Sequence, residues 1–255
     1  MLEARENHPC SYLPELEATT QYRWIEDCDA ETYQRMLERG WRRFGCTFFR
    51  PHCAHCRECR SLRVPVATFE PDRAMRRVFK RNRDLEIFLG PPSLSLEHLD
   101  LFGSYHAARS RERGWSPRET TPQDYFLSFV DGAHEFGAEL QLRLHEKLVA
   151  VALLDILPRG LSAIYCYYDP SLKERSLGTM AILAEMEIAR RRQIPQLFLG
   201  YWVEPNASMR YKARFKPHQL LTDRPDDGEP ARWRLPPSLG GPEAGASGEQ
   251  ERNEE

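Results

Sequence analysis

The order of the apolar segments in the second half of the chain is the feature that most constrains its fold. The longest apolar run, 148–154, is typical of a buried strand, and a turn signal at 158–160 separates it from a second strand rich in β-forming residues. The expected elements, in chain order, are strands over 148–157 and 161–168, a helix over 176–192, a strand over 197–199 and a helix over 206–215. Strands and helices interleaved in this way predict an α+β fold in which helices pack on a mixed sheet.

Composition divides the chain of 255 residues into three parts. Six of the seven cysteines lie within residues 1–90, and we expect this N-terminal cysteine-bearing region to end at the break formed by Pro91 and Pro92. Residues 91–224 contain the strand and helix pattern and are expected to form the C-terminal domain. Residues 225–255 are rich in Pro, Gly, Ser and Glu, which predicts a disordered acidic tail.

The sequence has no segment suited to a membrane or to export. Its longest apolar run covers seven residues, whereas a helix needs about 20 to cross a bilayer. Residues 1–9 are polar and lack the apolar core of a signal peptide. We therefore expect a soluble cytoplasmic protein with no membrane partner.

Three cysteines have a spacing that can hold a metal or a cluster. Cys53, Cys56 and Cys59 are each separated by two residues, and thiolates at this spacing can converge on zinc or on an Fe–S cluster. The next position of such a run is Arg63, so a further ligand would have to come from elsewhere, for example from Cys10 or His52. The same spacing also suits a turn of small residues with buried free thiols. We expect no required cofactor, and zinc or an Fe–S cluster at these cysteines is the alternative.

A run of basic residues predicts a cationic face on a helix expected over 71–84. Positions three and four apart are neighbours on a helix, so five basic residues share one face. These residues are Arg73, Arg76, Arg77, Lys80 and Arg81. Like charges repel, and a polyanion such as the tRNA phosphate backbone would relieve the repulsion, although a solvated face balanced by acids elsewhere is the alternative. Arg42 and Arg43 join the predicted tRNA-binding set, because Trp41 and Phe44 beside them can stack on unpaired nucleotides.

Two further constellations lie in the second half of the chain. Aromatic residues at 165–168 close a strand, and the loop 175–179 then begins a helix whose free N–H groups can hold a phosphate or a developing oxyanion. The aromatic residues at 200–202 precede a basic segment at 209–217. A capped helix and aromatic packing would explain the same residues without any chemistry. A loop that binds acetyl-CoA would contain more glycine than Gly178, which weakens an acetyltransferase interpretation.

Together these motifs resemble the bacterial aspartate/glutamate leucyltransferase family, relatives of the eukaryotic arginyl-tRNA–protein transferases. The resemblance covers roughly residues 8–220, and its segments occur in the same order as in that family. They are CSYLP at 10–14, GWRRFG at 40–45, FRPHCAHCREC at 49–59, VPV at 64–66, SAIYCYYDP at 162–170, RSLG at 175–178, LGYW at 199–202 and MRYKARFKP at 209–217. The chain departs from the family at 205–208, where Pro-Asn-Ala-Ser stands in place of an expected glycine-cysteine pair.

The resemblance implies a fold, a reaction and a set of partners. It implies a C-terminal acetyltransferase-like (GNAT-like) domain that does not use coenzyme A. The implied reaction moves leucine from leucyl-tRNA to a protein that begins with Asp or Glu, and the new N-terminal leucine would mark that protein for degradation. The implied partners are therefore leucyl-tRNA and substrate proteins with N-terminal Asp or Glu.

The reaction would be aminolysis of an ester, and the motifs supply candidate residues for it. The predicted catalytic residues are Ser176 for the oxyanion, Asp169 for the incoming amine and Tyr168 at the pocket wall. The predicted substrate-binding residues are Arg175, Lys212 and Arg214 for the acidic side chain of the acceptor, Tyr201 and Trp202 for the pocket and the terminal adenosine, together with Tyr168, and also Tyr211.

Three other functions compete with leucyl transfer. Arginyl transfer to the same acceptors would need an acid for the arginine side chain, and the sequence shows none obviously placed for it. A small-molecule N-acetyltransferase would need a glycine-rich loop. A non-catalytic, metal-sensing RNA-binding module would use the cysteines and the basic helix but would leave the motifs between 162 and 217 unexplained.

Overall fold

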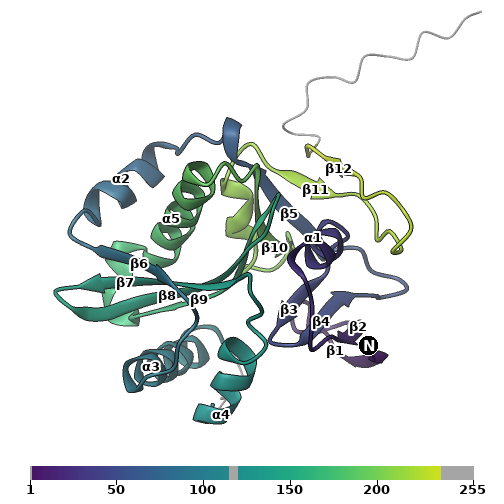
Figure 1. Ribbon diagram of the computed structural model, residues 1–255, viewed down its shortest axis with the longest axis horizontal. Coiled ribbons are helices and arrows are strands. Elements are labelled where there is room, and N and C mark those ends of the chain that lie inside the picture. Colours follow the sequence, from purple (N-terminus) through teal and green to yellow (C-terminus); the bar gives the residue numbers. More distant parts are fainter. Residues whose placement is uncertain (1, 115–119, 237–255) are drawn as a thin grey trace, which may run out of the picture.

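Figure 1 shows the computed structural model, which describes residues 2–114 and 120–236 and contains two β-sheets. The smaller sheet has the strand order β1-β2-β4-β3, and the larger has the order β12-β11-β5-β10-β9-β8-β7-β6. The strands of the smaller sheet are β1 (Leu2–Pro9), β2 (Glu17–Trp24), β3 (Arg42–Phe44) and β4 (Thr47–Pro51). Those of the larger sheet are β5 (Arg60–Pro65), β6 (Glu86–Gly90), β7 (Gly137–Leu144), β8 (Lys147–Ile156), β9 (Leu161–Tyr168), β10 (Gln196–Trp202), β11 (Gln219–Leu221) and β12 (Trp233–Arg234).

Helices cover both faces of the larger sheet. The helices α2 (Arg73–Arg81) and α5 (Leu177–Arg191) lie on one face, and α3 (Leu96–Arg113) and α4 (Pro122–Tyr125) lie on the other (Figure 1). Strand β8 is buried from Leu148 to Asp155 because both of its faces are covered, which explains its continuous apolar run. The predicted α+β fold with a mixed sheet is therefore confirmed.

Apolar clusters fill the space on each side of the larger sheet. On one side, Met180 and Ala184 of α5 pack with sheet residues such as Leu199. On the other side, Phe102 of α3 packs against Tyr167 of β9, with ring centroids 5.2 Å apart. Within residues 2–114 and 120–236, no helix combines the length and the apolar character needed to cross a membrane.

The helices predicted over 71–84 and 176–192 are present as α2 and α5. Asp72 begins α2, because its side chain accepts a hydrogen bond from the backbone N–H of Met75 at 2.7 Å. The helix predicted over 206–215 is shorter than expected: only the 3-10 helix η4 (Arg210–Arg214) forms there.

The parallel neighbours β9 and β10 separate along their length. They pair only at Leu197 with Leu161 and at Phe198 with Ser162. Beyond this point β10 shifts its register against β5, and Gly200 has φ of +78°, a backbone conformation that glycine adopts without side-chain conflict. The C-terminal halves of the two strands therefore leave an opening in the sheet.

The N-terminal region contributes strands to the larger sheet, so the two predicted regions share this sheet. Strand β5 pairs with β10 and β11, and β6 pairs with β7. Both strands come from residues 1–90, so the larger sheet combines strands from both sides of the predicted boundary. The remaining N-terminal strands form the smaller sheet, which carries β3 toward the opening between β9 and β10.

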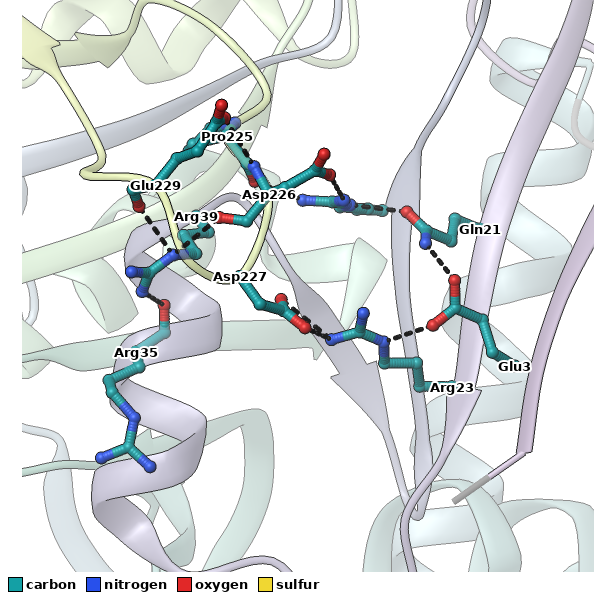
Figure 2. A network of polar contacts seen from close by, with 10 residues as sticks. Glu3, Gln21, Arg23, Arg35, Arg39, Pro225, Asp226, Asp227 and Glu229 are labelled. Carbon is teal, nitrogen blue, oxygen red and sulfur yellow. Dashed lines mark hydrogen bonds and ion pairs between the residues drawn. The ribbon is translucent and has the colours of Figure 1, made fainter.

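Residues 225–236 contact the rest of the fold, which corrects the predicted start of the disordered tail. Strand β12 pairs with β11, and the segment before it lies against β2 and the helix α1 (Ala30–Glu38), as Figure 2 shows. Arg39 donates a hydrogen bond of 3.2 Å to the carbonyl of Asp226, and Arg23 forms an ion pair of 2.8 Å with Asp227. Basic side chains thus hold the start of the acidic segment. The rest of the predicted tail lies outside the described residues.

Candidate active site

A cavity of about 710 Å³ lies where β9 and β10 separate. Its volume is within the range of small-molecule binding sites. Strands β9 and β10, the start of α5, the end of α3 and residues 207–215 contribute to its lining. The charged residues that line it are Arg42, Arg43, Arg109, Glu112, Arg113, Lys173, Glu185, Lys212 and Arg214. Basic side chains outnumber acidic ones seven to two in this set, so the cavity favours an anionic ligand.

Arg42 reaches the cavity from β3 of the smaller sheet. Its Nη2 donates a hydrogen bond to the carbonyl of Ala163 on β9, and its guanidinium lies 3.5 Å from the position that a Cβ would take on Gly200 of β10. Arg42 is 7% exposed, and its Nη1 is buried without a hydrogen-bond partner among the described residues. The sequence predicts a contact with tRNA phosphates for Arg42, but the structure buries its guanidinium between the separated strands.

Glu185 is the buried acid of the cavity lining, and the sequence analysis did not identify it. It lies on α5, is 2% exposed, and its Oε2 has no hydrogen-bond partner in the part of the chain that the structure describes. Burial raises the pKa of this carboxyl to about 8, although the charge of Arg42 acts to lower it. One signal was present in the sequence: Glu185 lies between Ile182 and Met186 on the otherwise apolar face of the helix.

Lys212 and Tyr201 lie on the β10 side of the cavity. Lys212 is 8% exposed, and its Nζ donates a hydrogen bond of 2.7 Å to the backbone carbonyl of Tyr201. Burial, followed by the neighbouring charge of Arg42, lowers the pKa of the Lys212 ammonium to about 7. The predicted substrate-binding residues that line the cavity are Tyr201, Tyr211, Lys212 and Arg214.

The start of α5 forms another wall of the cavity. Ser176 has φ of +53°, in the left-handed region, and its hydroxyl forms no capping hydrogen bond with the helix. Gly178 leaves room for the ring of Tyr168, since an added Cβ would lie 3.2 Å from it. Ser176, Gly178 and Tyr168 all line the cavity, so the structure brings two of the three predicted catalytic residues together. The first turn of α5, the positive end of its helix dipole, therefore borders the cavity.

Asp169 does not line the cavity, contrary to the prediction that it holds the incoming amine. Its carboxylate accepts hydrogen bonds from the backbone N–H and the hydroxyl of Ser171 at 2.9 and 2.6 Å, and forms an ion pair of 3.1 Å with Lys147. Burial acts to raise the pKa of Asp169, but these hydrogen bonds outweigh it and hold the pKa below its usual value. Asp169 thus caps the turn that precedes α5.

Arg175 and Trp202 also lie outside the cavity lining. The guanidinium of Arg175 forms two hydrogen bonds, of 2.8 and 2.9 Å, with the carboxylate of Asp84. Trp202 is buried in the core, where the guanidinium of Arg60 lies 4.6 Å from its ring centroid. Both residues are next to cavity-lining residues in the sequence, but their side chains contact Asp84 and Arg60 instead.

Arg43 has a structural role that its sequence context does not reveal. It is 4% exposed and pairs with Asp155 of β8, which is completely buried. It also donates hydrogen bonds to the carbonyls of Gly132 at 2.8 Å and Ala133 at 3.1 Å. Arg43 therefore connects the smaller sheet to the larger one, a role that the tRNA-binding prediction did not include.

The predicted cationic face of α2 is exposed to solvent. Among the described residues, none of its five basic side chains forms an ion pair with a carboxylate; the five are Arg73, Arg76, Arg77, Lys80 and Arg81. Phe79 on the same helix is 52% exposed. At the end of α2, Arg81 donates a hydrogen bond to the carbonyl of Glu174, next to the cavity-lining Lys173. The cationic face therefore leads toward the rim of the cavity.

The cysteines at 53, 56 and 59 lie in a loop between β4 and β5. Arg224 donates hydrogen bonds of 3.0 Å to the carbonyls of Cys53 and Cys56. Burial, followed by electrostatic repulsion from Cys10 and the other two cysteines, raises the pKa of Cys59 to about 12. Over residues 2–114 and 120–236, no three His, Cys, Asp or Glu side chains are arranged so that they could hold a metal ion.

Sequence comparison finds relatives along most of the chain. Residues 8–77 match the family described as "Arginine-tRNA-protein transferase, N terminus", and residues 97–222 match its C-terminal counterpart. An aspartate/glutamate leucyltransferase of Campylobacter jejuni is 39% identical over 212 residues, which cover 83% of this chain and 89% of that protein. An aspartate/glutamate leucyltransferase of Pseudomonas aeruginosa is 38% identical over 222 residues, covering 87% and 93%.

Structure comparison finds more distant similarities. FemX is 8% identical, with a TM-score of 0.45 over 78% of this chain and 79% of that structure. The PaiA N-acetyltransferase of Thermoplasma acidophilum, in complex with coenzyme A, is 15% identical, with a TM-score of 0.32 over 43% and 75%. Both TM-scores are below 0.5, so the fold is described from the strand order of this chain and not from these structures.

Proposed function

The chain belongs to the arginine-tRNA-protein transferase family and is an aminoacyltransferase, and we propose that it moves leucine from leucyl-tRNA to the N-terminal Asp or Glu of proteins. The names of relatives that are 38–39% identical over most of the chain support this donor and these acceptors. The modified protein would carry an N-terminal leucine that marks it for degradation. Because the donor is a charged tRNA, the proposed place of action is the cytoplasm.

The proposed reaction is the aminolysis of an activated ester. The α-amine of the acceptor attacks the leucyl carbonyl, the new C–N bond forms, and the bond to the 3′ oxygen of the tRNA breaks. The nitrogen loses a proton, and the leaving oxygen gains one. An α-amine has a pKa of about 7.7–8.0, so part of it is neutral at the pH of a cell. Positioning of the two substrates can therefore supply much of the rate.

The cavity between β9 and β10 is the observation that carries the proposal. It is large enough for an amino acid and the end of a nucleotide, and basic groups dominate its lining. Ser176 and the first turn of α5 could stabilise the oxyanion that develops on the leucyl carbonyl. Tyr168, Tyr201 and Tyr211 could pack against the terminal adenosine. A binding module without catalysis would leave this cavity without a role.

The cationic face of α2 is the proposed contact for the tRNA backbone. Its basic side chains are exposed, and the release of counterions from tRNA phosphates would favour their binding to the tRNA backbone. The hydrogen bond between Arg81 and Glu174 places the end of this helix next to the cavity rim at Lys173. A tRNA bound along α2 could therefore extend its single-stranded end into the cavity.

Arginyl transfer is the second candidate, and one residue favours it. Glu185 is a buried acid in the cavity lining, and a guanidinium on the donor amino acid could pair with it. The names of the relatives favour leucine instead. The two donors are therefore compared directly in the experiment that follows.

The test combines the purified protein with tRNA that carries radiolabelled leucine or, in parallel, radiolabelled arginine. The acceptors are three peptides that differ only in their first residue, which is Asp, Glu or Ala. The proposal expects label from leucyl-tRNA in the first two peptides and little in the third. Label from arginyl-tRNA alone would replace the donor. No label in any peptide, from protein with a normal unfolding transition, would contradict the proposed function.

A further inference from the structure

We propose that Arg42 and Glu185 together bind the N-terminal residue of the acceptor protein. In this assignment the Arg42 guanidinium binds the side-chain carboxylate of the N-terminal Asp or Glu, and the Glu185 carboxylate binds its α-amine. The inference rests on the proposed function, since it names the acceptor site of that reaction. It replaces Arg175 and Asp169, which the sequence predicts for these roles and which have other partners.

Arg42 has the geometry of a carboxylate receptor. Its guanidinium is held in place by the hydrogen bond to the carbonyl of Ala163, and the bare backbone of Gly200 lies beside it. Nη1 is buried and without a partner among the described residues, in a side chain that lines the cavity. A buried guanidinium that lacks part of its hydrogen bonding is costly, and a carboxylate would supply the missing acceptor with a charge-assisted bond.

Glu185 has the complementary property. Its side chain lines the same cavity, is almost completely buried, and has an oxygen, Oε2, that no described donor satisfies. The other acid of the lining, Glu112, is 55% exposed and already pairs with Arg109 at 3.1 Å. Glu185 is therefore the acid of the lining that is both buried and unpaired in residues 2–114 and 120–236. An ammonium or amine of a ligand would satisfy it.

The two groups fit one small substrate better than they fit each other. Arg42 acts on Glu185 electrostatically, yet the described structure contains no ion pair between them. An N-terminal Asp or Glu carries an α-amine and a carboxylate separated by only a few bonds. Such a residue could bridge the two groups and satisfy both of their unpaired atoms. A neutral N-terminal residue would leave Arg42 unsatisfied, and this would produce selectivity for acidic N-termini.

The site also provides a place for a proton. Burial raises the pKa of the Glu185 carboxyl to about 8, close to the range of about 7.7–8.0 for an α-amine. In the free protein Glu185 is mostly protonated at neutral pH; in the complex its carboxylate form takes one proton from the α-ammonium, which becomes the neutral amine that attacks, and Glu185 becomes a carboxylic acid. The second proton, which the nitrogen loses after attack, leaves with the 3′ oxygen of the tRNA.

The test compares leucyl transfer to two peptides that differ only in an N-terminal Asp or its neutral isostere Asn. Wild type should prefer Asp in kcat/KM. Arg42→Gln should reduce the Asp/Asn ratio on the order of 30-fold or more, because it removes the buried partner of the carboxylate. Glu185→Gln should lower kcat/KM for both peptides by a similar factor, because both have the α-amine. Glu187→Gln is the matched control, since Glu187 lies on the same helix and faces solvent.

A second measurement keeps the proposal testable if Arg42→Gln does not fold. A succinyl peptide retains the carboxylate of an Asp peptide but lacks its α-amine. Measured by direct binding to wild type without leucyl-tRNA, it should bind more weakly than the Asp peptide, and Glu185→Gln should remove this difference. The Arg42→Lys variant, which keeps the charge, should retain part of the Asp/Asn preference.

Several results would overturn the proposal while leaving the proposed function intact. An unchanged Asp/Asn ratio in Arg42→Gln, together with lower stability, would show that Arg42 serves only the fold. A change of donor preference in Glu185→Gln, without an effect on either acceptor, would assign Glu185 to the donor amino acid. By contrast, wild type that transfers no leucine to any acidic N-terminus would contradict the proposed function itself.

Discussion

The buried pair between Arg43 and Asp155 should be among the strongest single determinants of stability. Arg43 comes from β3 and Asp155 from β8, and both side chains are shielded from solvent, with exposures of 4% and 0%. The guanidinium also donates to carbonyls in the turn before β7, including that of Gly132 at 2.8 Å. The Asp155→Asn substitution keeps the size of the side chain but leaves the arginine charge buried without its counter-charge. Breaking a buried pair in this way costs about 3–5 kcal/mol of the free energy of unfolding.

Equilibrium unfolding in urea, followed by fluorescence, measures this cost. In a protein of this size, each kcal/mol corresponds to roughly 2–4 °C in Tm, so Asp155→Asn should also lower Tm by roughly 6–20 °C. The control is Glu31→Gln, which removes the exposed ion pair with Arg159 at 3.2 Å and should cost at most about 1 kcal/mol. A loss in Asp155→Asn no larger than in the control would refute the structural role of Arg43. So would a loss of tRNA affinity without a loss of stability.

Three further predictions follow from the structure. Arg76→Gln and Arg77→Gln on α2 should each lower the magnitude of the slope of log tRNA affinity against log salt concentration by about 1. Arg191→Gln, on an exposed part of α5, should leave this slope unchanged, and the binding of leucyl-tRNA at several salt concentrations measures both. Gly200→Ala should cost about 1–2 kcal/mol of unfolding free energy because φ is +78° there, and Gly90→Ala, in open space, should cost less; urea unfolding compares them. Glu185 keeps its proton up to pH about 8 in the folded protein but releases it near pH 4.3 when unfolded. The free energy of unfolding of the wild type should therefore fall as pH rises between these values, by up to about 1.4 kcal/mol per pH unit, and Glu185→Gln should lack this slope.

Local sequence signals predicted much of the second half of the fold. The apolar run in β8, the β-forming residues of β9 and the periodic helix α5 are each determined by nearby residues, and each is present close to its predicted bounds. The strands of the smaller sheet were not predicted, because their pairing joins separate parts of the chain, as in the pairing of β2 with β4. The entry of β5 between β10 and β11 depends on the same kind of long-range pairing.

The candidate site was predicted only in part for a similar reason. Residues near the aromatic motifs, such as Tyr168, Ser176 and Lys212, do line the cavity. The burial of Arg42 was not predicted, because its surroundings depend on the separation of β9 from β10, which no local pattern encodes. Glu185 was overlooked because its neighbours in sequence make it a helix residue, and only the cavity beside it explains why a charge is tolerated there.

The central claim is that the cavity between β9 and β10 is where leucine passes from tRNA to an acidic N-terminus. The most direct measurement is a crystal structure of the protein with a stable amide analogue of 3′-leucyl-adenosine. The account predicts that the analogue binds in this cavity, with its carbonyl beside Ser176 and the first turn of α5, and leaves Arg42 and Glu185 accessible to an acceptor. An analogue bound outside the cavity would contradict the central claim, and a leucyl group between Arg42 and Glu185 would contradict their assignment to the acceptor.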